Sequence, residues 1–246
     1  ITVGGTSTLK TRLNFNAADT AVSYAASPDG KVTIDGSTVT GAARGTVTIT
    51  ATAAGSSKTT TLTVTGGTAG NWVYVDSHSG QIQYTGNWVD ETSTNHYEGS
   101  AKEANDAPGA TASLTFTGTG FRWIGQMDSN YGRAWIYVDD VLVAIGNANS
   151  STNPYQFTIL ELHGLENKQH TVRLEAESNA PVQVDAFAYY TGTDLDETVS
   201  SVALEPSGLI RLGDGESKPV LAMAMNAERV VVFRDDFRFT LENDTI

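Results

Sequence analysis

The sequence predicts an all-β protein built from β-sandwiches in tandem. Three observations predict this fold class. Apolar and polar residues alternate along short segments rich in β-branched residues, turn signals built on Gly and Asp separate these segments, and no segment keeps a helical period over three turns. Strands spaced this closely are typical of β-sandwiches.

The alternation is clearest in five segments, which we predict to be strands: Val47–Ala51, Thr60–Thr65, Ala112–Phe116, Ala134–Val138 and Thr171–Ala176. Turn chemistry lies between the predicted strands, at Pro28–Gly30, Asp35–Gly36, Gly66–Gly67, Gly118–Gly120 and Gly213–Gly215. The segment that comes nearest to a helical pattern is Leu221–Arg229.

Aromatic residues and charge divide the chain into three parts, 1–66, 67–192 and 193–246. All four tryptophans and eight of the nine tyrosines lie between Asn71 and Tyr190, so we expect recognition to occur in the central part. The three parts carry net charges of +2, −9 and −6. The Gly66–Gly70 linker permits hinge motion unless Trp72 packs against a neighbour.

Composition excludes several classes of function. The chain carries 28 acidic and 15 basic residues without basic blocks, which argues against binding of nucleic acid or of an anionic membrane. It contains no cysteine, so disulfides, thiolate metal sites and cysteine nucleophiles are excluded. No apolar run approaches the roughly 20 residues that span a bilayer. The chain begins at Ile1 without a signal-peptide pattern, as expected for an internal or mature piece.

The first part carries a characteristic set of segments: Val3–Thr6, Leu9, Val32–Gly36 and, above all, Val39–Ala51 (VTGAARGTVTITA). With these segments residues 1–66 resemble a bacterial immunoglobulin-like group 2 domain. The resemblance implies that Gly41 and Gly45 serve a turn between two late strands and that Val47 and Ile49 face the core. The family's first strand would precede Ile1 and is missing here.

The last part carries Val199–Leu204, Gly208–Val220 and Glu242–Ile246. These segments resemble the opening half of a second domain of the same family, so 193–246 is predicted to be a partial immunoglobulin-like domain. A half-domain exposes sheet edges and an unfilled core. We therefore expect it either to be covered by another part or to be poorly ordered.

The central part carries, in order, Ile82–Trp88 (IQYTGNW), Tyr97–Ala101 (YEGSA), Gly109–Ala112, Phe116–Gly125 (FTGTGFRWIG), Gly132–Asp139 (GRAWIYVD), Gly164–Leu165, His170–Val172 and Val184–Phe187. In these segments residues 71–192 resemble the galactose-binding-like jelly rolls that serve as carbohydrate-binding modules beside bacterial polysaccharide-degrading enzymes. The resemblance implies a jelly roll over 67–192. It does not fix the ligand, because this fold also hosts lipid binders, protein binders and structural modules.

Strand alternation predicts the orientation of several side chains of the central part, and turn signals predict the roles of others. Trp123 is predicted to lie in the core, and Val172 and Leu174 to point inward. Asp139-Asp140 is predicted to be a hairpin turn, although relatives usually have Asp-Gly there. His170 follows a turn and precedes a strand, which favours a structural hydrogen-bonding role over contact with a ligand.

The first candidate sugar site is the loop end of the jelly roll, where the resemblance places the ligand in related modules. Aromatic rings there would stack on a sugar ring, while Asn and Asp side chains would bond its hydroxyls. The candidate residues are Trp88, Tyr97, Asp128, Asn130 and Tyr131. Tyr131 is the aromatic that we expect to be most exposed, whereas Trp88 either binds sugar or supports its loop.

The second candidate is a sheet face that bears Arg122, Trp135, Tyr137 and Arg173, which alternation turns outward. Trp135 alternatively lies under a neighbouring domain. The loops are favoured over this face because loops carry function more often than strands do.

Related jelly rolls often hold a structural Ca²⁺ between their first and last strands. In this sequence the resemblance makes Asp76 and Asp185 the candidate ligands, with Glu177 as a further candidate. Calcium prefers six to eight oxygen ligands, so two carboxylates alone do not make a site. The sequence leaves the presence of calcium open.

The resemblance implies a non-catalytic carbohydrate-binding region of a larger secreted bacterial polysaccharide-active enzyme, located outside the cell or on its surface. Its expected partners are a glycan and the flanking domains of the same polypeptide. Two alternatives stay open: a spacer or adhesin array without sugar binding, and a part of a glycoside hydrolase or polysaccharide lyase whose catalysis lies elsewhere. The sequence contains no nucleophile elbow, zinc-protease motif or phosphate loop.

Overall fold

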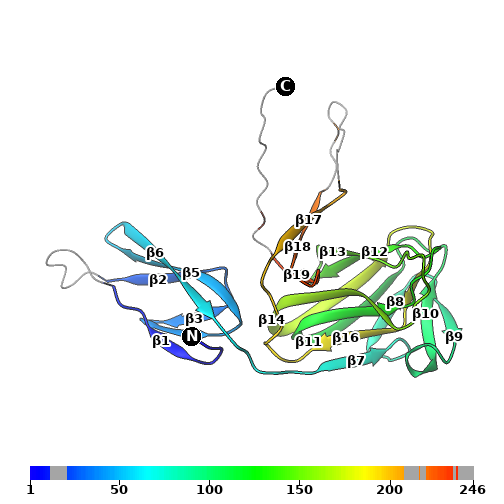
Figure 1. Cartoon of the computed structure of the whole chain (residues 1–246), viewed down its shortest axis with the longest axis horizontal. Coiled ribbons are helices and arrows are strands. Elements are labelled where there is room, and N and C mark those ends of the chain that lie inside the picture. Colours follow the sequence, from blue (N-terminus) through cyan, green and yellow to red (C-terminus); the bar gives the residue numbers. More distant parts are fainter. Residues whose placement is uncertain (12–20, 208–215, 217–219, 235–236, 238–246) are drawn as a thin grey trace.

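The computed structural model describes residues 1–11, 21–207, 216, 220–234 and 237 (Figure 1). The described residues form nineteen strands and a single three-residue 3-10 turn, η1 (Tyr97–Gly99). The all-β prediction is therefore confirmed. No helix in these ranges is long and apolar enough to cross a membrane.

The N-terminal part consists of two three-stranded sheets, ordered β1-β4-β3 and β2-β5-β6. The strands are β1 (Thr6–Thr8), β2 (Ser23–Ser27), β3 (Val32–Asp35), β4 (Thr38–Gly41), β5 (Gly45–Ala53) and β6 (Ser56–Val64). A small core lies among them, in which Val47 and Ile49 are buried as predicted. The finer assignment to the bacterial immunoglobulin-like group 2 family stays a prediction.

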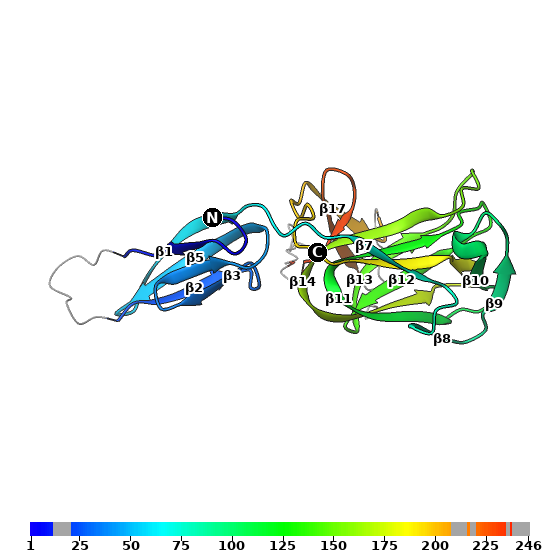
Figure 2. The same ribbon diagram turned by 90° about the horizontal axis from the view of Figure 1, so that it is seen from below.

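The central part contributes ten strands to the structure: β7 (Trp72–Asp76), β8 (Ile82–Thr85), β9 (Val89–Thr92), β10 (Ser100–Ala104), β11 (Thr111–Gly125), β12 (Arg133–Val138), β13 (Val141–Asn147), β14 (Phe157–Ala176), β15 (Val182–Val184) and β16 (Ala186–Tyr190). The predicted strands at 112–116, 134–138 and 171–176 all lie within these elements. Figure 2 shows this part and the N-terminal part arranged one after the other along the long axis.

The two longest strands, β11 and β14, pair with each other along nearly their whole length. The register breaks between Gly118 and Gly120, where the partner in β14 changes from Lys168 to His163. On its other edge β11 pairs with β8 before the break and with β16 after it. A Cβ atom on Gly118 would lie 2.3 Å from the carbonyl oxygen of Tyr190, so glycine permits the close approach at this bend.

The core confirms the inward assignments made from alternation. Trp123 is fully buried and donates its Nε1–H to the carbonyl oxygen of Gln183 at 2.8 Å. Val172 and Leu174 are buried in the same cluster. Large aromatic side chains supply much of the buried area that stabilises such a core.

The predicted hairpin and the predicted structural histidine are also confirmed. Asp139 and Asp140 both have positive φ, 50° and 66°, as a two-residue turn between β12 and β13 requires. The buried His170 ring has Nδ1 at 2.8 Å from Asp139 Oδ2 and Nε2 at 2.8 Å from the carbonyl oxygen of Glu166. His170 therefore links the turn to the bend of β14.

The described strands of the last part join the sheet of the central part. They are β17 (Ser201–Glu205), β18 (Leu221–Met225) and β19 (Val231–Val232), and the sheet order is β17-β18-β19-β14-β11-β16-β7. Met223 and Val231 pack in the main core. The helix-like segment Leu221–Arg229 thus begins with a strand.

The central part lies against the predicted half-domain of 193–246. Its first strands extend the jelly-roll sheet instead of forming a separate sheet within the described residues. The predicted turn Gly213–Gly215, most of Gly208–Val220 and all of Glu242–Ile246 lie outside the described residues. The assignment as a partial immunoglobulin-like domain stays a prediction.

The linker between the first two parts is held along its length. The amide N–H of Thr193 donates to the carbonyl oxygen of Thr68 at 2.8 Å, and that of Gly70 donates to the hydroxyl of Tyr190 at 3.0 Å. Trp72 packs on Tyr190, with ring centroids 5.3 Å apart. The sequence predicts hinge motion at the linker unless Trp72 packs against a neighbour, and Trp72 does pack.

A buried ion pair makes a second connection between the parts. Lys31, on the turn before β3, contacts Glu197, which follows the central part, and both side chains are almost fully buried. Burial lowers the pKa of Lys31 to about 8, with a further lowering by nearby Arg234. The N-terminal part is therefore tied to the jelly roll both through the linker and through this pair.

Candidate functional site

Three loops meet beside β9 and β10, the strands that lie farthest from β1–β6 in Figure 1. Asp128 and Asn149 form an isolated bridge between two of the loops, 126–132 and 148–156. The side-chain amide of Gln156 donates to the carbonyl oxygen of Asn95 at 2.9 Å, which ties in the third loop, 93–99. This loop end is the region in which the sequence predicted a sugar site.

Tyr131 is not the exposed aromatic that the sequence predicted. It is partly buried against the main core, and its hydroxyl donates to Glu103 Oε2 at 2.7 Å. Burial raises the pKa of Glu103, although the bond from Tyr131 acts in the opposite direction. The prediction fails because a buried carboxyl group needs a donor, and Tyr131 supplies it.

Trp88 also packs inward, as its second interpretation required. Its ring lies edge-on to Tyr84 with centroids 5.0 Å apart, and its Nε1–H donates to the carbonyl oxygen of Thr85 at 3.1 Å. The side chain is partly buried against the main core. Trp88 therefore supports its own loop in this structure.

Asp128 and Asn130 lie in one turn, and Asp128 shapes it. One carboxylate oxygen of Asp128 accepts the backbone N–H of Asn130 at 3.0 Å and the hydroxyl of Ser129 at 3.2 Å. Asn130 is exposed and Asp128 is half-buried. Contact of either with a glycan stays a prediction.

Tyr97 is the predicted site aromatic that lies nearest to the sheet. Its ring stacks on Tyr74 of β7, with centroids 5.7 Å apart and an interplanar angle of 26°. Its backbone N–H donates to Asp185 Oδ1 at 2.8 Å. Tyr74 is 45% exposed and was not among the candidates, because alternation alone did not separate it from an ordinary edge-strand residue.

The second candidate surface divides into two, which corrects the prediction that Arg122 shares a face with the other three residues. Arg122 lies after the bend of β11 and donates to Glu161 Oε2 at 2.9 Å, with its guanidinium 3.9 Å from the centroid of Trp72. Arg173 lies after the corresponding bend of β14, opposite Ser113 in the part of β11 that precedes its bend, and its guanidinium is 3.9 Å from the centroid of Tyr137. The break at Gly118 to Gly120, which alternation does not reveal, separates the two.

Trp135 and Tyr137 are half-buried on β12. The Nε1–H of Trp135 lies 3.3 Å from Glu177 Oε1, and Glu177 also forms a bidentate pair with Arg133 at 2.7 and 2.6 Å. Glu177 is thereby committed to Arg133 and Trp135, which removes it from the predicted calcium set.

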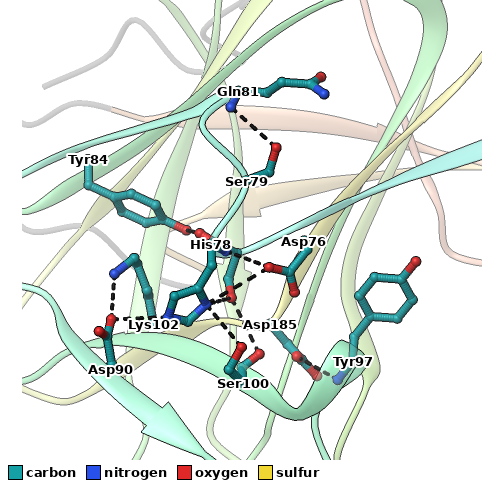
Figure 3. Close-up of polar contacts among 11 residues, drawn as sticks. Asp76, His78, Ser79, Gln81, Tyr84, Asp90, Tyr97, Ser100, Lys102 and Asp185 are labelled. Carbon is teal, nitrogen blue, oxygen red and sulfur yellow. Dashed lines mark hydrogen bonds and ion pairs between the residues drawn. The ribbon is translucent and has the colours of Figure 1, made fainter.

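Asp76 and Asp185 lie close together where β7 ends and β16 begins (Figure 3). Each has a buried Oδ2 atom without a hydrogen-bond partner. The Nδ1 atom of His96 is also buried without a partner. His96 Nδ1 is 3.8 Å from Asp185 Oδ2. Burial, together with the neighbouring charge of Asp76, raises the pKa of Asp185 to about 7, although the hydrogen bond from the backbone of Tyr97 acts in the opposite direction.

These unpartnered carboxylate oxygens fit a hard cation, because a buried polar atom without a partner is costly and calcium prefers oxygen ligands. Among the described residues no group of three or more His, Cys, Asp or Glu side chains is placed to hold a metal. A calcium ion bound by Asp76 and Asp185 would therefore take its other ligands from backbone carbonyls and water.

A second polar cluster adjoins these carboxylates and was not predicted. The ring of His78 has Nδ1 within 3.0 Å of Ser77 Oγ and 3.1 Å of Ser100 Oγ, and Nε2 within 3.2 Å of Asp90 Oδ1 (Figure 3). Serine, histidine and aspartate also make up hydrolytic triads. Here, however, Asp90 binds Lys102, whose hydrogen bond holds the pKa of Asp90 below its usual value. The cluster links the turn after β7 to β9 and β10.

We compared the chain with known protein families, sequences and structures. No protein-family model matches the chain. An A type blood N-acetyl-alpha-D-galactosamine deacetylase of Flavonifractor plautii is 36% identical over 118 residues, which is 48% of this chain and 15% of that enzyme. An A type blood alpha-D-galactosamine galactosaminidase of the same organism is 34% identical over 119 residues, 48% of this chain and 11% of the enzyme. Half of the chain is related to two sugar-processing enzymes.

The matched region spans less than a sixth of either enzyme. Among solved structures, a study of promiscuous specificity in carbohydrate-binding modules of the β-sandwich superfamily contains a similar chain. It is 14% identical, covers 70% of this chain and 97% of its own, and superposes with a TM-score of 0.26, which is too low for comparison in detail.

Proposed function

We propose that this chain is a non-catalytic carbohydrate-binding region of a larger enzyme that acts on glycans. One observation carries the proposal. A segment of 118 residues matches a deacetylase at 36% identity, and a segment of 119 residues matches a glycosidase at 34% identity. The two enzymes catalyse different reactions on related sugars, so matches of nearly equal length to both are better explained by a shared kind of ligand than by either reaction.

The length of the match supports this reading, because the jelly roll predicted for 71–192 has nearly the same length. The named sugars of the relatives suggest the ligand class, a glycan that carries galactosamine or N-acetylgalactosamine. As in other modules of this kind, weak binding at one site would be raised by neighbouring modules of the same polypeptide. We also propose that the protein lies outside the cell or at a bacterial surface.

We further propose that a calcium ion bound at Asp76 and Asp185 has a structural role. The support is the pair of buried, unpartnered carboxylate oxygens and the hydrogen bond that the backbone N–H of Tyr97 donates to Asp185. An ion there would neutralise two adjacent carboxylates and fix η1. No step of glycan binding requires the ion to touch the sugar.

The hydrogen-bonded linker between the first two parts favours a second candidate function, a rigid spacer or adhesin segment without sugar binding. Hydrogen bonds along Thr68–Gly70 and the buried Lys31–Glu197 pair hold the first two parts together. A spacer would need this rigidity, whereas a binding module would only benefit from it.

A glycan array with the whole chain separates the candidates. The array should include glycans ending in galactosamine, in N-acetylgalactosamine and in unrelated sugars, each with calcium and with EDTA. Selective retention of one class supports the binding module. Absence of retention on every class, by a protein whose melting curve shows a folded state, would leave the spacer.

A further inference from the structure

The outer face of the β14-β11-β16-β7 sheet is covered along β7 by three aromatic side chains, Trp72, Tyr74 and Tyr97. Register places Glu161, Arg122, Ala188 and Tyr74 in one row across the four strands. Side chains alternate across a strand, so this row points away from the core that holds Trp123 and its neighbours. The face is thus separate from the loop end, although Tyr97 reaches it from η1.

Small residues form the floor of this face. Ala186 and Ala188 are fully buried, although they point outward, because Trp72 and Tyr97 pack over them. The larger rings therefore stand above the sheet along β7. Tyr74 is stacked on Tyr97 on one side and is 45% exposed, which leaves a broad aromatic surface open to solvent.

The cation of this face, Arg122, is paired within it. Arg122 is bound by Glu161 at 2.9 Å and stacks over Trp72 at 3.9 Å. Asp76, at the end of β7, accepts the backbone N–H of His78 through Oδ1 at 2.7 Å. With its cation neutralised, the surface offers aromatic carbon and tyrosine hydroxyls, which suits a neutral, amphipathic ligand better than a polyanion.

We propose that Tyr74, backed by Tyr97, is the platform on which a neutral pyranose ring of the glycan stacks. This inference rests on the proposed function and assigns it a site outside the loop tips. A pyranose presents C–H groups on one face and hydroxyls at its rim, which matches an exposed tyrosine ring with a polar edge. Among the described strands β7 pairs only with β16, so its other edge leaves Tyr74 open to approach.

Two of the aromatics predicted for the loop tips are not available as a platform. Trp88 and Tyr131 are used internally, as described above. Two exposed aromatics remain at or beside the loop tips: Tyr155, which is 40% exposed and contacts His96 edge-on at 5.4 Å, and Phe157, which is 46% exposed and begins β14. Tyr74 and Tyr155 have similar exposure, so each serves as the matched control for the other.

The test compares Tyr74→Ala, Tyr74→Phe and Tyr155→Ala in the whole chain, by calorimetric titration with the glycan that the wild type retains. We expect Tyr74→Ala to weaken binding roughly tenfold, as loss of one stacking contact does. Tyr74→Phe keeps the ring and should bind within about threefold of wild type. Tyr155→Ala should bind as the wild type does. Tyr74→Leu, which keeps an apolar side chain on the edge strand, replaces the alanine variant if that variant does not fold.

Two results would overturn the inference in different ways. Wild-type affinity in both Tyr74→Ala and Tyr74→Leu, with loss in Tyr155→Ala, would move the site to the loop tips and leave the proposed function intact. A wild-type protein that binds no glycan would remove the proposed function itself, and the platform with it.

Discussion

The hydroxyl of Tyr131 donates to Glu103 Oε2 at 2.7 Å beneath the loop end. We therefore expect Tyr131→Phe to destabilise the protein by about 1–3 kcal/mol, because the change leaves a buried carboxyl oxygen without its donor. Denaturant unfolding measures the loss. Glycan affinity should stay at the wild-type level, since the hydroxyl points inward.

The exposed tyrosine of the neighbouring loop provides the control for this change. Tyr155→Phe removes a hydroxyl from a side chain that is 40% exposed and should alter the free energy of unfolding by less than about 0.5 kcal/mol. Equal stability of Tyr131→Phe and wild type would show that Glu103 does not depend on this donor.

A charged cluster at the start of β12 holds β17 to the jelly roll. Arg133 binds Glu177 through two bonds of 2.7 and 2.6 Å and Glu205 of β17 through one of 2.7 Å. We expect Arg133→Ala to lower the free energy of unfolding by about 1 kcal/mol at pH 7, the upper end for partly exposed pairs. Lys168→Ala, which removes an exposed pair with Glu166, should have little effect.

The same cluster predicts a dependence on pH. The hydrogen bond from Arg133 lowers the pKa of Glu177 below its model-peptide value of 4.5. A carboxyl group with a depressed folded pKa stabilises the protein fully above the unfolded value and loses that contribution as the pH falls through the folded value. The difference between wild type and Arg133→Ala should therefore shrink below about pH 4.5. A difference that stays constant down to pH 2 would contradict the assignment.

Glycine at position 70 allows the linker to close against the segment that follows β16. A Cβ atom there would lie 1.9 Å from the backbone nitrogen of Gly192. We expect Gly70→Ala to open this contact and to cost about 1–3 kcal/mol. Hydrogen exchange of the amide groups of Thr191 and Thr193 should become faster, and small-angle scattering should show a wider range of orientations of the first part.

Gly80 supplies the matched glycine control. No atom lies within 4 Å of a Cβ placed there. Gly80→Ala should leave both exchange and scattering unchanged. If Gly70→Ala behaves in the same way, the linker is not held by this approach.

Local chemistry was enough to predict the strands and several buried side chains. The alternation around Trp123, the Asp139-Asp140 turn and the role of His170 depend on neighbours in sequence, and all three are confirmed. The resemblance predicted a β-sandwich in the central part, but the bend of β11 and β14 escaped the prediction. That bend comes from a register break at Gly118 to Gly120, and a break in pairing cannot be seen in one strand alone.

The site residues were harder to predict because their exposure depends on distant partners. Tyr131 is buried by Glu103, 28 positions earlier, and Arg122 is paired with Glu161, 39 positions later. Tyr74 and Tyr97 are separated by 23 positions and meet only because η1 folds back over β7. Composition could therefore locate the aromatic module but not which of its aromatics face solvent.

The pair Asp76 and Asp185 gives the last prediction. Two adjacent carboxylates with buried, unpartnered oxygens repel each other, so a bound cation should stabilise the fold. We expect calcium to raise the melting temperature of the wild type relative to EDTA, by roughly 2–8 °C for a stabilisation of about 1–2 kcal/mol. In Asp185→Asn the calcium response should disappear, while the protein in EDTA should be at least as stable as the wild type in EDTA, since one of the two buried charges is gone. Asp128→Asn, which alters a carboxylate of the loop turn, should keep the full response. Identical melting of the wild type with calcium and with EDTA would show that the two carboxylates are stabilised without a cation, and a proton shared with Asp185 would then be the simpler account.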